Sequence, residues 1–302
     1  MKRPTTKKVI VIALAAVLLA IGYVGLFVID YDYGEESEKL QVVTSFYPLY
    51  FFASEIGGDR AEISSLIPNN MEPHSWNPKP SDLIGTSRSD VFVYNGGGFE
   101  PWADGFIAQL ENEVEVVDTS EGIEVGSNDP HFWLDPLTAK VQVDNIASAF
   151  IMADPENATY YQANAADLKS RLDQLDQDFT AGLEGRTKND IVTTHEGFNY
   201  LAMRYGFEAH AAIGISGDEQ PSVQDMARLT DLIVGLGLHY VFSEPTFNDA
   251  VMQQISDQTG VEVLVLDGVH SQSGVNSDKD YFEMMYANLE ALMIGMEVRT
   301  DV

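Results

Sequence analysis

Two patterns of hydrophobic residues alternate along the first half of this chain. Short runs of Val, Ile, Leu and Phe are typical of buried strands, and segments with helical spacing separate them. The runs predict strands at residues 40–46, 62–67, 91–94 and 114–117. Helices are expected at residues 49–56, 81–89 and 100–110, and Ser81 is expected to cap the second of them. Such alternation predicts an α/β fold with a parallel sheet and helices on both of its faces.

The same alternation restarts after residue 190 and predicts a second lobe of the same kind. Strands are expected at residues 191–194, 208–213, 240–243 and 261–266. Helices are expected at residues 197–205, 223–236, 248–259 and 280–296. Ser222, which follows Pro221, is a suitable N-cap for the second of these helices.

A strict helical stripe lies between the two lobes, at residues 156–183. Its apolar members recur at spacings of three and four and are Ala158, Tyr161, Ala165, Leu168, Leu172, Leu175 and Phe179. A helix of this length would span roughly 42 Å. The stripe could form a coiled-coil seam between two molecules, but one rigid helix that packs against both lobes is the simpler interpretation. We therefore expect an N-terminal lobe at residues 40–154, a connecting helix at 155–185 and a C-terminal lobe at 186–302.

The N-terminal residues 1–39 are expected to lie outside the fold. Residues 9–29 are apolar and uncharged, which is long enough to cross a bilayer. Four basic residues precede them, which predicts a cytoplasmic N-terminus and an extracytoplasmic remainder. The run is longer than the apolar part of a cleaved signal peptide, so an uncleaved membrane anchor is favoured over a secreted or periplasmic form. The ten residues 30–39 are polar and would form a tether.

Charge and cysteine content narrow the possible partners. The chain has 17 basic and 47 acidic residues, and its net charge is −30. Such a surface repels nucleic acid, so no nucleic-acid partner is expected. The chain contains no cysteine. It therefore has no thiol for lipid attachment or for a thiolate metal site, and any metal must be held by nitrogen and oxygen.

Four side chains in comparable settings are candidate metal ligands. His131 lies in a turn framed by prolines and flanked by Asp129 and Asp135, as suits an imidazole that must be held in place. His74 follows Pro73 in a similar loop. His195 and Asp267 each end a predicted strand of the second lobe. Ligands of α/β sheets bind outside the carboxyl ends of the strands, so two lobes that face each other would bring all four side chains into one cleft.

The order of these motifs resembles a known family. The segments EPHSW, DPHFWLDP, a long helix, VTTHEGFNYLA, PS, FSEP and VLVLDG follow one another as in the solute-binding subunits of zinc and manganese ABC importers. The resemblance covers residues 40–300. It implies two (β/α) lobes joined by a long helix, and one transition-metal ion in the cleft held by His74, His131, His195 and Asp267. It also implies that a membrane permease, and through it an ATPase, receives the ion from a monomeric binding protein.

The expected ion is Zn²⁺. Three imidazoles and one carboxylate form the tetrahedral set that zinc prefers, whereas manganese favours more oxygen ligands. Manganese remains the alternative ion, and nitrogen sets bind copper and nickel as well. A cell-surface zinc hydrolase is the less favoured function class, because an enzyme would need an open position for water. An adhesin-like role is a further alternative within the same family.

Other polar residues near these motifs have simpler interpretations. His210, His239 and His270 are each expected to be structural or exposed, although the loop with His270 is expected to border the cleft. Glu72, two residues before His74, could accept a hydrogen bond or bind the ion directly. Glu244 is expected to support a ligand or to pack between the lobes rather than to bind the ion.

Overall fold

The computed structural model describes residues 39–69, 71–110, 113–124, 129–215, 221–272 and 276–299. The expected anchor at residues 9–29 and nearly all of its tether lie outside these ranges. Within them, no helix is both long and apolar enough to cross a membrane. All the elements described below belong to one compact unit, residues 39–302.

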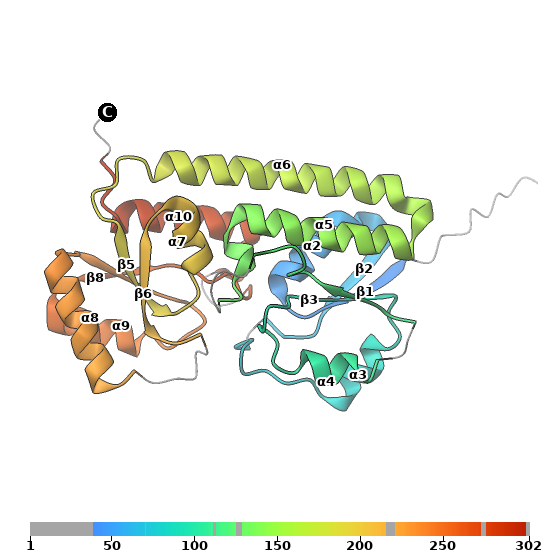
Figure 1. The fold of residues 1–302 in the computed structure, drawn as a ribbon, viewed down its shortest axis with the longest axis horizontal. Coiled ribbons are helices and arrows are strands. Elements are labelled where there is room, and N and C mark those ends of the chain that lie inside the picture. The colour runs from blue at the N-terminus through green and yellow to red at the C-terminus, as the bar shows by residue number, and fades with distance from the viewer. Residues whose placement is uncertain are drawn as a thin grey trace, which may run out of the picture. The chain divides into compact units, whose positions relative to one another are not determined.

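The N-terminal lobe is built on a four-stranded parallel sheet with the order β2-β1-β3-β4. Its strands are β1 (Leu40–Thr44), β2 (Ala61–Ser65), β3 (Val91–Tyr94) and β4 (Glu115–Asp118). Its first helices are α2 (Tyr47–Gly57), α3 (Pro80–Thr86) and α4 (Ala103–Ile107), with a short 3-10 turn, η1 (Gly58–Arg60), after α2. The two sides of the sheet are covered by different helices, α2 on one side and α3 with α4 on the other (Figure 1).

The C-terminal lobe contains two parallel strand pairs, β5–β6 and β7–β8. The strands are β5 (Asp190–His195), β6 (Glu208–Ile213), β7 (Tyr240–Ser243) and β8 (Glu262–Val265). β5 and β7 contact each other, which places the two pairs next to one another. The helices are α7 (Asn199–Tyr205), α8 (Val223–Leu236), α9 (Ala250–Thr259) and α10 (Tyr281–Gly295).

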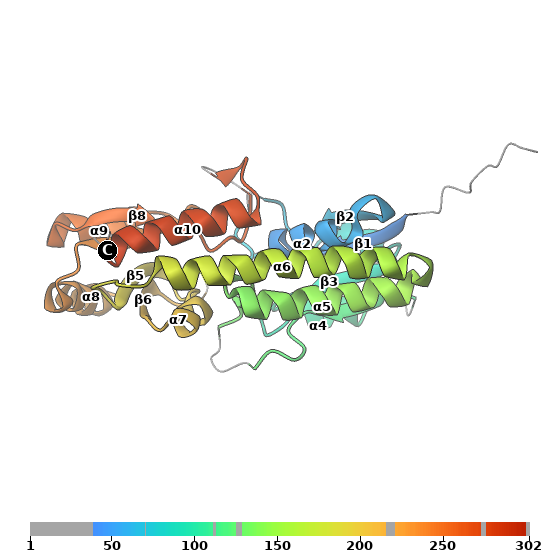
Figure 2. The same ribbon diagram turned by 90° about the horizontal axis from the view of Figure 1, so that it is seen from above.

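The chain passes from the first lobe to the second through the long helix α6 (Ala158–Gly182). η2 (Phe132–Leu134) leads into α5 (Pro136–Ala153), and η3 (Pro155–Asn157) leads into α6. α6 runs along both lobes (Figures 1 and 2) and contacts α2 and α5 of the first lobe and α10 of the second. The predicted stripe of α6, apart from the partly exposed Ala158, is buried in a hydrophobic core that takes residues from both lobes. The helix is therefore a shared wall of the core, which favours the connecting-helix interpretation over a seam between two molecules.

Most predicted elements are confirmed within two or three residues. β3, β6, β7 and α8 have the predicted bounds, and Ser222 caps α8 through the backbone N–H of Asp225. Ser81 is not the N-cap of α3, because Lys79 holds that position and Pro80 begins the helix. Proline at the first helical position needs no backbone hydrogen bond, so the helix can start earlier than expected.

The helix α5 was not predicted. Pro136 begins it, and the side chain of Asp135 accepts a hydrogen bond from the Leu137 backbone N–H, 2.8 Å away. Both are ordinary helix-start signals. α5 packs between the sheet of the first lobe and α6, so two of its sides are buried. Even the polar residue Gln142 is fully buried. A helix with two buried faces lacks the single apolar stripe on which the sequence interpretation relied.

Leu172→Ala tests the role of α6 as a shared wall. Leu172 is fully buried in the core that both lobes share, so its truncation should lower the free energy of unfolding by about 2–5 kcal/mol. Gln177, which is exposed on the same helix, provides the control. Gln177→Ala should change stability by about 0.5 kcal/mol or less. Urea unfolding of both variants measures the difference, and equal effects would contradict the shared wall.

Candidate metal centre

Four histidines from separate parts of the chain converge on one point. His74 lies in the loop between β2 and α3, and His131 lies directly before η2. His195 is the last residue of β5, and His270 follows β8. The first two therefore come from the N-terminal lobe and the last two from the C-terminal lobe. One ligand atom of each histidine lies within 4.8 Å of the others.

The Nε2 atom of His131 lies at the centre of the group. It is 3.2 Å from Nε2 of His74, 3.0 Å from Nε2 of His195 and 3.1 Å from Nε2 of His270. Four nitrogens at the usual zinc–nitrogen distance of about 2.0–2.1 Å would be about 3.3–3.4 Å apart in a tetrahedron. The observed separations are slightly shorter than that. The three separations that involve His131 are thus close to those in a tetrahedral zinc site, and the four ligand atoms all lie within 4.8 Å of one another.

Two buried carboxylates bind the outer nitrogens of the central histidines. Oδ1 of Asp129 lies 2.5 Å from Nδ1 of His131 and accepts its backbone N–H at 2.9 Å. Oε1 of Glu244 lies 2.7 Å from Nδ1 of His195 and accepts its backbone N–H at 3.1 Å. The other oxygen of Asp129 accepts the backbone N–H of Asn199, at the start of α7. Asp129 therefore ties a histidine of one lobe to a helix of the other.

These contacts determine where the ring protons lie. A neutral imidazole has one N–H, and a carboxylate beside Nδ1 draws that proton to Nδ1. The Nε2 atoms of His131 and His195 then carry lone pairs that face each other without a proton between them. Burial lowers the pKa of His131, and it lowers that of His74, beside the other imidazoles, to about 2. Neutral lone pairs held this close repel one another unless a cation lies between them.

Asp267 is not part of the converging group and instead builds the turn that carries His270. One of its oxygens accepts the Val269 backbone N–H at 2.7 Å, and the other accepts the side-chain amide of Asn276. Asn288 fixes the backbone of Asp267 from both sides. Burial raises the pKa of Asp267, although these hydrogen bonds oppose the shift. The sequence predicted Asp267 as a metal ligand, whereas His270, and not Asp267, belongs to the converging group in the structure.

The turn itself is strained. Val269 has φ of +55°, a left-handed conformation that β-branched residues rarely adopt. Such a conformation costs on the order of 1–3 kcal/mol and persists only where surrounding contacts enforce it. The Asp267 carboxylate supplies one of those contacts. In the sequence, the one signal of this turn is that Asp267 precedes His270 by three residues.

Two other expected acids have structural roles. Both oxygens of Glu72 accept backbone N–H groups, from His74 at 3.0 Å and from Ser75 at 2.8 Å. Glu72 thus shapes the loop of His74 and is not in the converging group. Asp135, the second carboxylate flanking His131, caps α5. Of the two flanking acids, Asp129 alone bonds the His131 ring.

The group is buried, with one side closer to solvent. His131, His195 and His270 are at most 1% exposed, whereas His74 is partly exposed. An ion would therefore enter past the His74 loop. Gly197 packs against two of the buried rings, because a Cβ there would collide with the His195 ring and come within 3.1 Å of the His131 ring. Only a residue without a side chain lets the backbone pass so close to both rings.

Aromatic rings surround the histidines. The Phe99 ring lies 4.7 Å from that of His74, and the Phe247 ring lies 4.7 Å from that of His195. Trp133 lies 5.1 Å from His131, and its Nε1–H donates to the Gly268 carbonyl at 2.8 Å. These rings exclude water, which strengthens electrostatic interactions inside the site. The Trp133 bond also joins the lobes directly beside the cluster.

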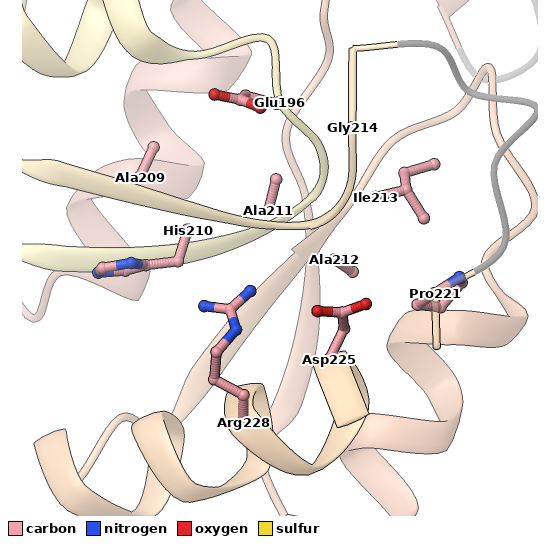
Figure 3. Close-up of a pocket in the computed structure, with 10 residues that line it drawn as sticks. All are labelled: Glu196, Ala209, His210, Ala211, Ala212, Ile213, Gly214, Pro221, Asp225 and Arg228. Atoms are coloured by element: carbon pink, nitrogen blue, oxygen red, sulfur yellow. The ribbon is translucent and has the colours of Figure 1, made fainter. Parts of the chain in front are cut away.

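A separate pocket of about 390 Å³ lies in the C-terminal lobe between β6 and α8 (Figure 3). Its polar lining consists of Glu196, His210, Asp225 and Arg228. Nε2 of His210 is bonded to Oδ1 of Asp190 at 2.9 Å, and Nδ1 of His239 is bonded to Oε1 of Glu297 at 2.6 Å. These two histidines have the structural roles expected for them, and neither belongs to the converging group.

Comparison with known proteins identifies relatives of the chain. Residues 42–294 match the family model described as ZnuA, zinc-uptake complex component A, periplasmic. The high-affinity zinc uptake system protein ZnuA of Bacillus subtilis is 30% identical over 287 residues, which cover 88% of this chain and 90% of that protein. The chain spans only 56% of the length of several related streptococcal zinc-binding AdcA proteins.

Solved structures share the fold. The Zn(II)-bound ZnuA-like domain of Streptococcus pneumoniae AdcA has a TM-score of 0.77 at 30% identity, with 86% of this chain and all of that domain covered. The laminin-binding protein Lmb of Streptococcus agalactiae, a bifunctional protein with adhesin and metal-transporting activity, has a TM-score of 0.80 at 28% identity. The match covers 85% of this chain and 99% of that protein. The likeness spans both lobes in each case.

His270→Gln should make the stability of the metal-free protein less sensitive to acid. Burial holds the pKa of His270 well below 6.5 in the folded state, whereas in the unfolded chain the imidazole titrates near 6.5. Below that pH the unfolded chain binds the additional proton, so stability falls as the pH falls, by about 1.4 kcal/mol per pH unit for this group. Urea unfolding between about pH 7.5 and pH 5 should show that the free energy of unfolding depends less steeply on pH in the variant, by the uptake of one proton. Equal slopes would contradict the buried neutral imidazole.

Proposed function

Because the chain belongs to the ZnuA family of zinc-uptake binding components, we propose that it captures one Zn²⁺ between its lobes and delivers the ion to an ABC importer. It is the extracytoplasmic substrate-binding subunit and not an enzyme. The observation that carries the proposal is the convergence of four Nε2 atoms, three of which lie 3.0–3.2 Å from that of His131, close to the spacing in a tetrahedral zinc site. The proposed ligands are His74, His131, His195 and His270.

The charge of the site supports a divalent cation. Four neutral imidazoles bring no charge to the ion. Asp129 and Glu244 lie directly behind two of them and are both buried. Together two carboxylates would balance the charge of Zn²⁺ without contacting it. Hydrogen bonds from ligating imidazoles to carboxylates also fix the ring orientation and raise the basicity of the ligand.

The same arrangement argues against hydrolytic chemistry. A catalytic zinc keeps one position for water beside three protein ligands. Here four nitrogens would fill the coordination sphere, and three of the four residues are almost fully buried. The ion is therefore cargo that the protein binds and releases unchanged.

A nitrogen-only set favours zinc over manganese. Manganese prefers oxygen ligands and a higher coordination number, and replacing the expected carboxylate with His270 removes the one oxygen donor. Copper and nickel bind nitrogen sets strongly, so exclusion of these ions would depend on geometry and availability. Metal analysis of protein purified without chelators, followed by competition between zinc and manganese, tests this assignment.

Delivery requires partners outside the chain. We propose a membrane permease, and through it an ATPase, as the recipients of the ion, with the binding subunit acting as a monomer. Residues 9–29 would hold the subunit at the membrane. A laminin-binding role is an alternative that rests on the likeness to Lmb and to the laminin-binding protein Lbp of Streptococcus pyogenes.

His131→Ala tests the proposed function. The variant loses the central nitrogen and the partner of Asp129, so zinc affinity should fall by more than the 10–100-fold typical of losing an outer hydrogen-bond partner. Competition with a zinc chelator measures the affinity, and circular dichroism confirms that the variant is folded. Wild-type affinity in a folded His131→Ala protein would show that zinc is bound elsewhere. A wild-type protein that binds no zinc would overturn the function itself.

His270→Ala and Asp267→Asn together decide the fourth ligand. His270→Ala should reduce zinc affinity as strongly as loss of another ligand does. Asp267→Asn keeps the size of the side chain and an oxygen for the Val269 N–H, so it should reduce affinity by about tenfold or less. If the Asp267 variant lost as much affinity as the His270 variant, the carboxylate would be a ligand and the proposed set would be wrong.

A further inference from the structure

One oxygen of Glu244 can accept a hydrogen bond and one nitrogen of His270 can donate one, and neither atom has a partner among the described residues. Glu244 follows β7 and is 2% exposed. Its Oε1 atom holds His195, as described above, but its Oε2 atom is buried and has no partner among the described residues. Nδ1 of His270 is likewise buried without a partner in the described part of the chain. Buried polar groups are rarely left in this state unless function requires it.

These two atoms approach the same glycine. A Cβ on Gly268 would lie 2.7 Å from Nδ1 of His270 and 3.2 Å from Oε2 of Glu244. Both atoms therefore border the space beside the Gly268 Cα, and any residue other than glycine would push into that space. Gly268 is also the residue whose carbonyl accepts the Trp133 N–H, so its backbone is held in place.

The chemistry of ligation makes the two atoms a donor and an acceptor. When Nε2 of His270 binds an ion, the single proton of the neutral ring must be on Nδ1. Metal-ligating histidines almost always donate that N–H to a carboxylate, a carbonyl or water. Oε2 of Glu244 is the buried carboxylate oxygen that faces the same glycine, and it has capacity to accept.

We propose that Glu244 is a positioning residue for two ligands at once, holding His195 through Oε1 and His270 through Oε2. The inference rests on the proposed function, because it assigns an outer partner to the fourth ligand. The hydrogen bond to His270 forms when the ion fixes that ring, directly or through one water molecule, which transmits the interaction almost equally well. The Glu244 carboxylate thus holds both histidine ligands of the C-terminal lobe, whereas the Asp129 carboxylate holds a single ligand of the N-terminal lobe.

A double-mutant cycle distinguishes this role from support of His195 alone. Glu244→Gln keeps the shape of the side chain, but its amide can accept from one imidazole only and presents an N–H to the other. In the wild-type background this should reduce zinc affinity by about 10–100-fold. In a His270→Ala background the amide oxygen can serve His195 without conflict. There the same substitution should cost a few-fold at most.

Asp129→Asn is the matched control, because Asp129 bonds His131 and not His270. Its fold-loss should be the same with and without His270→Ala. Chelator competition measures all the affinities, and the visible spectrum of bound Co²⁺ reports whether the tetrahedral geometry changes. If Glu244→Gln misfolds, Glu244→Asp replaces it, since the shorter carboxylate cannot reach both rings.

An equal fold-loss for the Glu244 substitution in both backgrounds would overturn the shared role. That result would leave zinc capture intact, since the wild-type protein would still bind the ion through its four histidines. Absence of zinc binding in the wild-type protein would instead refute the proposed function on which the inference rests. The two failures are therefore separable.

Discussion

The site depends on one electrostatic constraint, the approach of four imidazole lone pairs to 3.0–3.2 Å around Nε2 of His131. Asp129 and Glu244 fix the protons on the outer nitrogens of His131 and His195, so the inner nitrogens cannot share a proton without losing those bonds. Burial disfavours protonation of the rings as a second way to relieve the repulsion. A cation bound between the rings is therefore the way in which this repulsion is relieved. The rest of the molecule holds the two lobes close enough for this arrangement to persist.

Several hydrogen bonds between the lobes lie close to the histidines. Trp133 donates to the Gly268 carbonyl, Tyr281 donates to the Trp133 carbonyl at 2.5 Å, and Asp129 accepts from Asn199. The continuous helix α6 packs along both lobes away from the site. A helix without an internal proline has no evident point at which to bend sharply. Ion entry past the His74 loop therefore fits the architecture better than wide opening of the lobes.

Much of the fold could be predicted from the sequence, because most elements have one buried face and clear start and stop signals. The stripe of α6 and the cap of α8 by Ser222 are examples. α5 was missed because it is buried on more than one side and so lacks a single stripe. Ser81 has a side chain suited to capping, but Pro80 begins the helix earlier and so leaves Lys79 at the N-cap position.

The site was predictable where a histidine ends a strand or lies in a proline-framed turn. His74, His131 and His195 satisfied that condition, and the structure brings them together. The fourth position was not predictable, because which of Asp267 and His270 faces the cleft depends on a tight turn through Gly268 and Val269 with a left-handed valine. No local propensity indicates such a turn; it is enforced by the hydrogen bonds that Asp267 makes to Val269 and Asn276.

X-ray absorption spectroscopy of the zinc-loaded protein tests the proposed set of four histidine ligands most directly. We expect a shell of four nitrogens at about 2.0–2.1 Å with the outer scattering of four imidazoles. A shell with three imidazoles and one carboxylate oxygen would contradict this account.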